Sequence, residues 1–161
     1  MSTRSWIAME EKESEEIKAI YCHFDGYLDG VGVTLMSYFD NEEDAKMIMK
    51  YGDRSSLPEH NEPEIKKEDL LRDSSYAESK GYKMDGTNEL FTCERDMMHN
   101  IRGDIMIEYI YLWKDGKWNV SYLEMSNNED AYNDYVSYHS KFKELQKEID
   151  EQYSEKKESS K

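Results

Sequence analysis

Apolar residues recur at every second position in several short stretches of this chain, which is the pattern of half-buried β-strands. The stretches 4–10 and 17–24 show it, and the polar segment EKESEE between them suits the turn of a β-hairpin. Within the second stretch, Cys22 shares a face with Ile20 and Phe24, because side chains alternate along a strand. Cys22 is therefore interpreted as a small core residue.

The clearest local pattern is the sequence DIMIEYIYLW, followed by KDGK and WNVSYLEM. Two aromatic and β-branched runs, 104–113 and 117–125, flank an Asp115-Gly116 turn, which is a strong β-hairpin pattern. Both faces of the first run are largely apolar, so we expect a central strand that is covered on both sides or by a partner. Alternation places Ile105, Ile107, Tyr109, Tyr111 and Trp113 on one face, and Met106, Ile110 and Leu112 on the other. A fifth strand is predicted over 90–96.

Helical periodicity predicts three helices, over 33–39, 42–51 and 129–155. Asn41 and Asp44 resemble a capping box at the start of the second helix, and Gly52 fits its C-terminal cap. The third helix carries a heptad-like row of apolar side chains at Tyr135, Tyr138, Phe142, Leu145 and Ile149, widened by Tyr132 and His139.

These elements predict a single α+β domain, in which an antiparallel sheet of about five strands is covered by helices. We expect residues 1–126 to form the α+β body, and residues 127–161 to form a long C-terminal helix with a frayed polar tail. Such a long helix either packs across the sheet of its own domain or pairs with a second copy, giving a homodimer through 129–155.

The net charge of the chain limits the kinds of partner that it can bind. The chain has 161 residues with 36 acidic and 21 basic side chains, a net charge of −15, and residues 1–64 alone carry −9 of it. We do not expect direct nucleic-acid binding, because Lys and Arg are needed to neutralise phosphates. No apolar run reaches the roughly 18 residues of a membrane span, and no signal peptide is recognised, so we expect no membrane association. With only two cysteines, the cytoplasm is the expected compartment.

An acidic chain of this kind can instead occupy a basic, nucleic-acid-binding surface on another protein. The alternative is that the charge serves solubility alone. The acidic side chains that would stand in for phosphates lie in the first hairpin turn and around the start of the second helix. They are Glu10, Glu11, Glu13, Glu15, Glu16, Asp40, Glu42, Glu43 and Asp44.

The segment IYCHFDGYLDGVG invites a different interpretation. It reads as a strand end followed by a tight, glycine-dependent turn that needs a positive φ and leads into a helix. The alternative is a ligand-binding turn, because free N–H groups at a helix start favour anions. That turn would use Tyr21, His23, Asp25, Tyr27, Gly30 and Gly32. The glycine spacing matches neither the dinucleotide fingerprint nor the P-loop.

Catalytic and metal sites are weakly supported. A Cys22 nucleophile would need His60, His99 or His139 as its base, and the sequence selects none of them. Cys22-His23 and Cys93-x5-His99 lack the short cysteine spacing of structural zinc sites. We therefore expect a protein that is not an enzyme and uses no metal or cofactor.

Several blocks of sequence occur in a familiar order. MSTRSWIAME, IYCHFDGYLDGVGVTLMSYF and KMIMKYGDRSSL are followed by EYIYLWKDGKWNVSY. This order resembles a family of small phage and prophage proteins with an STRS start, a YCHxDGY-glycine block and a GDxSSL segment. The resemblance touches most of residues 1–57 and 104–123, while 58–103 and 129–158 depart from it.

The resemblance implies a phage setting, in which small acidic proteins often act by stoichiometric binding to host proteins. The expected function is a phage-encoded, non-enzymatic inhibitor of the anti-CRISPR or anti-restriction type. It would bind a host defence protein, a nucleic-acid-binding nuclease, through an acidic surface that mimics nucleic acid, in the cytoplasm of the host cell. The alternative is a protein that sequesters or hydrolyses a small molecule or nucleotide signal at the YCHFDGYLDGVG turn.

Overall fold

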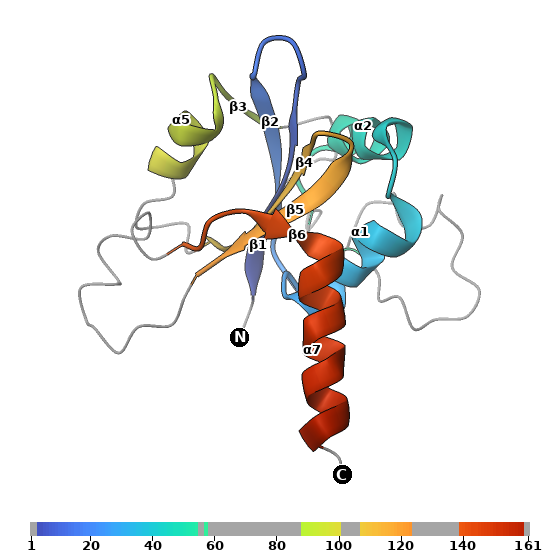
Figure 1. Cartoon of the computed structure of the whole chain (residues 1–161). Coiled ribbons are helices and arrows are strands. Elements are labelled where there is room, and N and C mark those ends of the chain that lie inside the picture. Colours follow the sequence, from blue (N-terminus) through green and yellow to red (C-terminus); the bar gives the residue numbers. More distant parts are fainter. Residues whose placement is uncertain (1–2, 55–56, 58–87, 101–106, 124–138, 160–161) are drawn as a thin grey trace.

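The computed structural model describes residues 3–54, 57, 88–100, 107–123 and 139–159. They form one six-stranded sheet with helices on both of its faces (Figure 1), so the α+β class is confirmed. The patterns predicted at 104–106, 124–125 and 129–138 lie outside the described residues, as does His60.

The strand order in the sheet is β3-β2-β1-β4-β5-β6. The strands are β1 (Arg4–Glu10), β2 (Ile17–Cys22), β3 (Glu89–Phe91), β4 (Ile107–Lys114), β5 (Lys117–Tyr122) and β6 (Lys143–Glu144). Both predicted hairpins form, β1 with β2 and β4 with β5. One pairing departs from the antiparallel expectation: β1 and β4 are parallel, with Met9 opposite Trp113. Because these two strands run the same way, the turns that follow them lie at the same end of the sheet.

Strand β4 is central, as its apolar faces predicted, but its alternation is interrupted. Arg4 lies opposite Ile107, whereas Ser5 lies opposite Tyr109, so Glu108 is an extra residue in the ladder. Such a β-bulge shifts the side chains before it to the other face. Ile107 therefore belongs to the cluster that contains Ile110 and Leu112, and not to the face of Tyr109, as strict alternation predicted.

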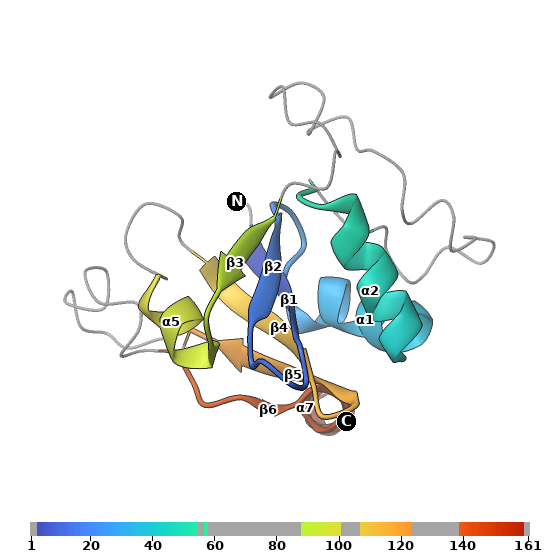
Figure 2. The ribbon, with the colours of Figure 1, turned by 90° about the horizontal axis from the view of Figure 1, so that it is seen from above.

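The helices are α1 (Val33–Tyr38), α2 (Glu42–Tyr51), α5 (Glu94–His99) and α7 (Leu145–Ser159), and a five-residue π-helix, η1 (Leu28–Gly32), leads into α1. Figure 2 shows α5 on one side of the sheet and α1 and α2 on the other. The core on the α1, α2 and α7 side includes Ile7, Ile20, Cys22, Leu35, Ile48, Tyr111, Trp118, Val120, Leu145 and Ile149. Among the helices described, none is long and apolar enough to cross a bilayer.

Two elements have other bounds in the structure than the sequence pattern predicts. The strand expected at 90–96 ends at Phe91, and α5 begins at Glu94. Within the range 129–155 expected to be helical, the described residues 139–144 instead extend the sheet, and α7 begins at Leu145. There the backbone N–H of Ser140 donates to the carbonyl of Tyr122 at 2.9 Å, which satisfies a polar group on the outer edge of β5. Beyond its buried first turns, α7 extends away from the body (Figure 1).

Candidate functional site

A groove of about 1050 Å³ opens at the end of the sheet where the two hairpin turns meet α2. We call it the hairpin groove. It is lined by Met9, Glu10, Glu11, Lys12, Glu13, Glu16, Lys18, Glu42, Lys46, Met49, Lys50, Trp113, Asp115 and Gly116.

The parallel pairing of β1 with β4 creates this groove, because it places turns 11–16 and 115–116 side by side. The indole N–H of Trp118 donates to the carbonyl of Phe39 at 2.9 Å, and this bond anchors the chain just before α2 near the same end. After α2, Arg54 forms a β-bridge with Cys22 at the far end of β2. Helix α2 therefore runs along the sheet from the turns toward the opposite end.

The groove has an apolar floor. Met49 and Trp113 are 3% and 5% exposed, and the half-buried Met9 lies beside them. The Trp113 ring packs edge-on against Trp118, with ring centroids 5.4 Å apart. This floor is rigid, because both indoles belong to the core of the domain.

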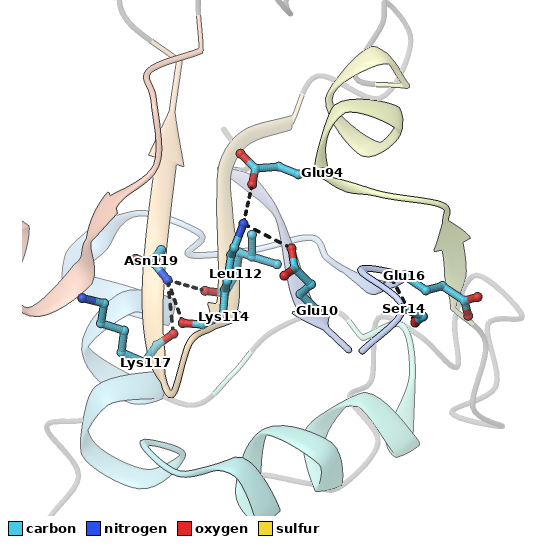
Figure 3. Close-up of polar contacts among 8 residues, drawn as sticks. All are labelled: Glu10, Ser14, Glu16, Glu94, Leu112, Lys114, Lys117 and Asn119. Atoms are coloured by element: carbon cyan, nitrogen blue, oxygen red, sulfur yellow. Dashed lines mark hydrogen bonds and ion pairs between the residues drawn. The ribbon is translucent and has the colours of Figure 1, made fainter. Parts of the chain in front are cut away.

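Five of the nine acidic residues predicted to bind a partner line the groove. Glu11, Glu13 and Glu16 come from the first hairpin turn, whose shape follows from its backbone contacts. The Glu11 N–H donates to the Glu16 carbonyl at 2.8 Å, and Glu15 adopts a left-handed φ of 63°. The Ser14 hydroxyl accepts a bond from the Glu16 N–H at 3.3 Å (Figure 3). The turn therefore holds its glutamate side chains exposed around one end of the groove.

Two of the nine predicted acids form contacts within the fold: Glu10, which also lines the groove, and Asp44, which does not. Glu10 pairs with Lys114 at 3.4 Å, and Lys114 also contacts Glu94 at 3.3 Å, which joins β1, β4 and α5 (Figure 3). Desolvation lowers the pKa of Lys114, but the two carboxylates raise it more, so the net shift is upward. Asp44 is 8% exposed and accepts a bond from the Asn41 amide at 2.6 Å.

The remaining predicted acids, Glu15, Asp40 and Glu43, are exposed but do not line the groove. Asp115 does line it, although its sequence indicated only a turn. The groove also contains four lysines that the sequence did not single out: Lys12, Lys18, Lys46 and Lys50. The helical spacing of Lys46 and Lys50 could have placed both on one face of α2, but not beside the hairpin.

The YCHFDGYLDGVG segment forms a strand end and a compact turn, as its structural interpretation predicted. Its side chains contact one another in two pairs. The Tyr21 hydroxyl and the Nδ1 of His23 are hydrogen-bonded at 2.6 Å, and the Tyr27 hydroxyl donates to the Asp25 carboxylate at 3.2 Å. The expected positive φ falls on Asp25, at 57°, and not on a glycine. The Val31 N–H donates to the Asp25 carbonyl at 2.9 Å, so this residue closes the turn.

The glycines of this turn are required by close packing. A Cβ on Gly30 would lie 2.2 Å from the Asp25 carbonyl oxygen, and one on Gly32 would lie 3.3 Å from the Tyr111 ring. The Tyr111 hydroxyl donates to the Gly26 carbonyl at 2.6 Å and ties the turn to the sheet. Asp53 lies beside the YCH residues, since its carboxylate accepts the Tyr21 N–H at 2.9 Å.

Burial disfavours nucleophilic chemistry at Cys22. Cys22 is fully buried, its thiol donates to the Phe24 carbonyl at 3.6 Å, and desolvation raises its pKa to about 11. A nucleophilic cysteine needs a lowered pKa and an accessible sulfur. Cys93 precedes α5 as its N-cap residue. Within the described ranges, no group of three or more His, Cys, Asp or Glu residues could hold a metal ion.

No protein-family model, curated protein or solved structure matches this chain.

Proposed function

We propose that this chain is a phage-encoded, non-enzymatic inhibitor that binds a host defence protein through the acidic end of the hairpin groove. The partner is a nucleic-acid-binding protein, such as a nuclease of a restriction or CRISPR system. The glutamates of the groove occupy the basic surface that would otherwise hold phosphates.

One observation carries the proposal: acids that are far apart in the sequence come together around a single concave surface. Glu11, Glu13 and Glu16 come from the first hairpin, Glu42 from the first turn of α2 and Asp115 from the second hairpin. Like charges gathered on a surface repel one another, which opposes folding. The carboxylates that stabilise the fold, those of Glu10 and Asp44, are the ones withdrawn into contacts.

Binding of this kind is fast and sensitive to salt, since exposed charges are screened beyond a Debye length of about 8 Å at physiological ionic strength. Steering by an acidic surface raises association rates by about 10-fold or more at low salt. Rim charges change mainly the association rate, whereas buried contacts change the dissociation rate.

The test combines a pull-down from host lysate with a triple charge reversal in the groove. The variant Glu11→Lys, Glu13→Lys, Glu16→Lys removes the acidic hairpin turn without touching Glu10 or Asp44. We expect the wild type to capture a nucleic-acid-binding protein at low salt, and DNA to compete for it. The association rate of the variant with the captured protein should fall about 10-fold.

The matched control carries the same change of charge elsewhere. Glu89, Glu151 and Glu155 are exposed and lie outside the groove, so reversing all three tests net charge alone. Equal loss of binding in both variants would reduce the effect to net charge and overturn the groove as the site. Capture of a partner that is insensitive to DNA, salt and the groove variant would defeat the proposal altogether.

The alternative function places a small molecule or nucleotide signal at the YCHFDGYLDGVG turn. The β-bridge between Cys22 and Arg54 favours it, because this bridge brings a buried cation next to the turn. Against this function, the side chains that would bind the ligand already contact one another in two pairs, Tyr21 with His23 and Tyr27 with Asp25. Mass spectrometry of the purified chain discriminates the two functions: a co-purified nucleotide would favour the turn.

A further inference from the structure

The charges of the hairpin groove are separated along its length. The acidic end lies at the two hairpin turns and the first turn of α2, where Glu42 lies. Farther along, the groove is lined by Lys18 of β2 and by Lys46 and Lys50 of α2. Because α2 runs away from the turns, its last-turn Lys50 lies farthest from the acidic end.

The ammonium groups of these lysines can still pair with an acidic group of a ligand. Lys46 pairs with Glu42 at 3.5 Å, but both side chains are about two-thirds exposed, so the pair is weak. In the part of the chain that the structure covers, Lys18 and Lys50 form no ion pair. The lysine at the acidic end, Lys12, lies among four glutamates of the same turn.

The apolar floor lies between the two charged ends. Met9 is the β1 residue paired with Lys18, and it lies opposite Trp113 on the other side. Met49 faces the same floor from α2. The aliphatic stems of the lysines extend this surface, since such side chains bury their methylenes while the ammonium group stays in water.

We propose that the groove takes one amphipathic segment of a partner protein, in a fixed orientation. Its basic end meets Glu11, Glu13 and Glu16, an apolar side chain rests on Met9, Met49 and Trp113, and an acidic group meets Lys18 and Lys50. This inference rests on the proposed function and names the kind of segment that the partner presents. A uniformly basic segment fits only the acidic end, because its other charges would face the lysines.

Two synthetic peptides of equal length test the orientation. The bipolar peptide has arginines at one end, a central leucine and glutamates at the other end, while the basic peptide has arginines at both ends. Affinities of both peptides are measured by fluorescence anisotropy at physiological salt, for the wild type and for Lys18→Glu, Lys50→Glu. The control is Lys141→Glu, Lys147→Glu, which reverses two exposed lysines outside the groove.

We expect the lysine reversal in the groove to weaken the bipolar peptide and strengthen the basic one. Each affinity should change by about 2- to 30-fold, the range given by two exposed charge pairs, and the ratio should shift by the product of the two changes. The control should leave the ratio nearly unchanged. Replacing the central leucine by asparagine should weaken the bipolar peptide about tenfold, since an apolar side chain is lost from the floor.

The outcomes separate this inference from the proposed function. An equal shift of the ratio in both lysine variants, or no binding of the bipolar peptide by the wild type, would overturn the oriented segment. The acidic site would survive the first result if the reversal at Glu11, Glu13 and Glu16 still weakened both peptides. If that reversal changed neither peptide and also left lysate capture intact, the proposed function itself would fail.

Discussion

Replacing Gly30 by alanine should destabilise the fold more than the same change at Gly32, although both glycines belong to one turn. A Cβ at Gly30 would lie 2.2 Å from the carbonyl oxygen of Asp25, and this oxygen already accepts the Val31 N–H at 2.9 Å. A Cβ at Gly32 would meet Tyr111 at 3.3 Å. The first contact forces backbone to move, whereas the second needs a shift of a few tenths of an ångström.

The magnitude follows from three terms. Forcing an extra carbon into a packed site costs about 1–3 kcal/mol. Displacing the Asp25 carbonyl also weakens a hydrogen bond worth about 0.5–1.5 kcal/mol. Alanine recovers about 1 kcal/mol over glycine in a helical backbone at either position. We expect a net loss of about 1–3 kcal/mol for Gly30→Ala, and a change within about 1 kcal/mol for Gly32→Ala.

Urea and thermal unfolding, followed by circular dichroism, measure both changes. For a domain of this size, 1 kcal/mol lowers Tm by about 2–4 °C, so Gly30→Ala should lose about 2–12 °C. Gly116→Ala is a control for backbone strain, because Gly116 has a φ of 77° and no atom within 4 Å of its Cβ position. The reasoning is refuted if Gly30→Ala melts with the wild type, or if Gly32→Ala loses more than Gly30→Ala.

Two further changes test the packing around α2 and β2. Asn41→Ala should cost about 0.5–2 kcal/mol in urea unfolding, because the Asn41 side chain accepts the Asp44 N–H at 2.9 Å as an N-cap, and Asn41→Ser should restore most of it. Burial raises the pKa of Cys22 from 9.0 to about 11, so the unfolded chain loses this proton first as pH rises. The free energy of unfolding should therefore fall between pH 9.0 and a pH of about 11, by up to about 1.4 kcal/mol per pH unit. An equally steep fall in Cys22→Ala would show that Cys22 is not its cause.

Elements set by local chemistry could be predicted from the sequence. Helix α2 was predicted over 42–51, with Asn41 and Gly52 at its ends, and the structure has the same bounds and caps. The Asp115-Gly116 turn is equally local, because both residues adopt a positive φ that their types favour. The burial of Cys22 followed from simple alternation along β2.

Elements set by distant pairing could not be predicted. The row of Phe142, Leu145 and Ile149 has helical spacing, yet Phe142 precedes α7 because its neighbours complete the edge of β5. The parallel pairing of β1 with β4 cannot be predicted from the hydrophobic pattern of either strand, because each strand is an apolar run that does not indicate its partner or direction. The hairpin groove depends on that register, so its acids could be proposed one by one but not as a surface.

The same register limits how far the chain resembles a nucleic acid. A phosphate backbone presents negative charge at every step, about one charge per 1.7 Å of a duplex. Here Lys18, Lys46 and Lys50 follow the acids farther along the groove, and Glu10 and Asp44 are withdrawn into contacts with Lys114 and Asn41. A partner's basic surface can therefore be matched at the acidic end of the groove but not along its whole length. Under the proposed function, the groove would inhibit its partner by occupying one part of a binding channel and blocking the rest, and specificity would come from the apolar floor and the lysines, which a nucleic acid does not have.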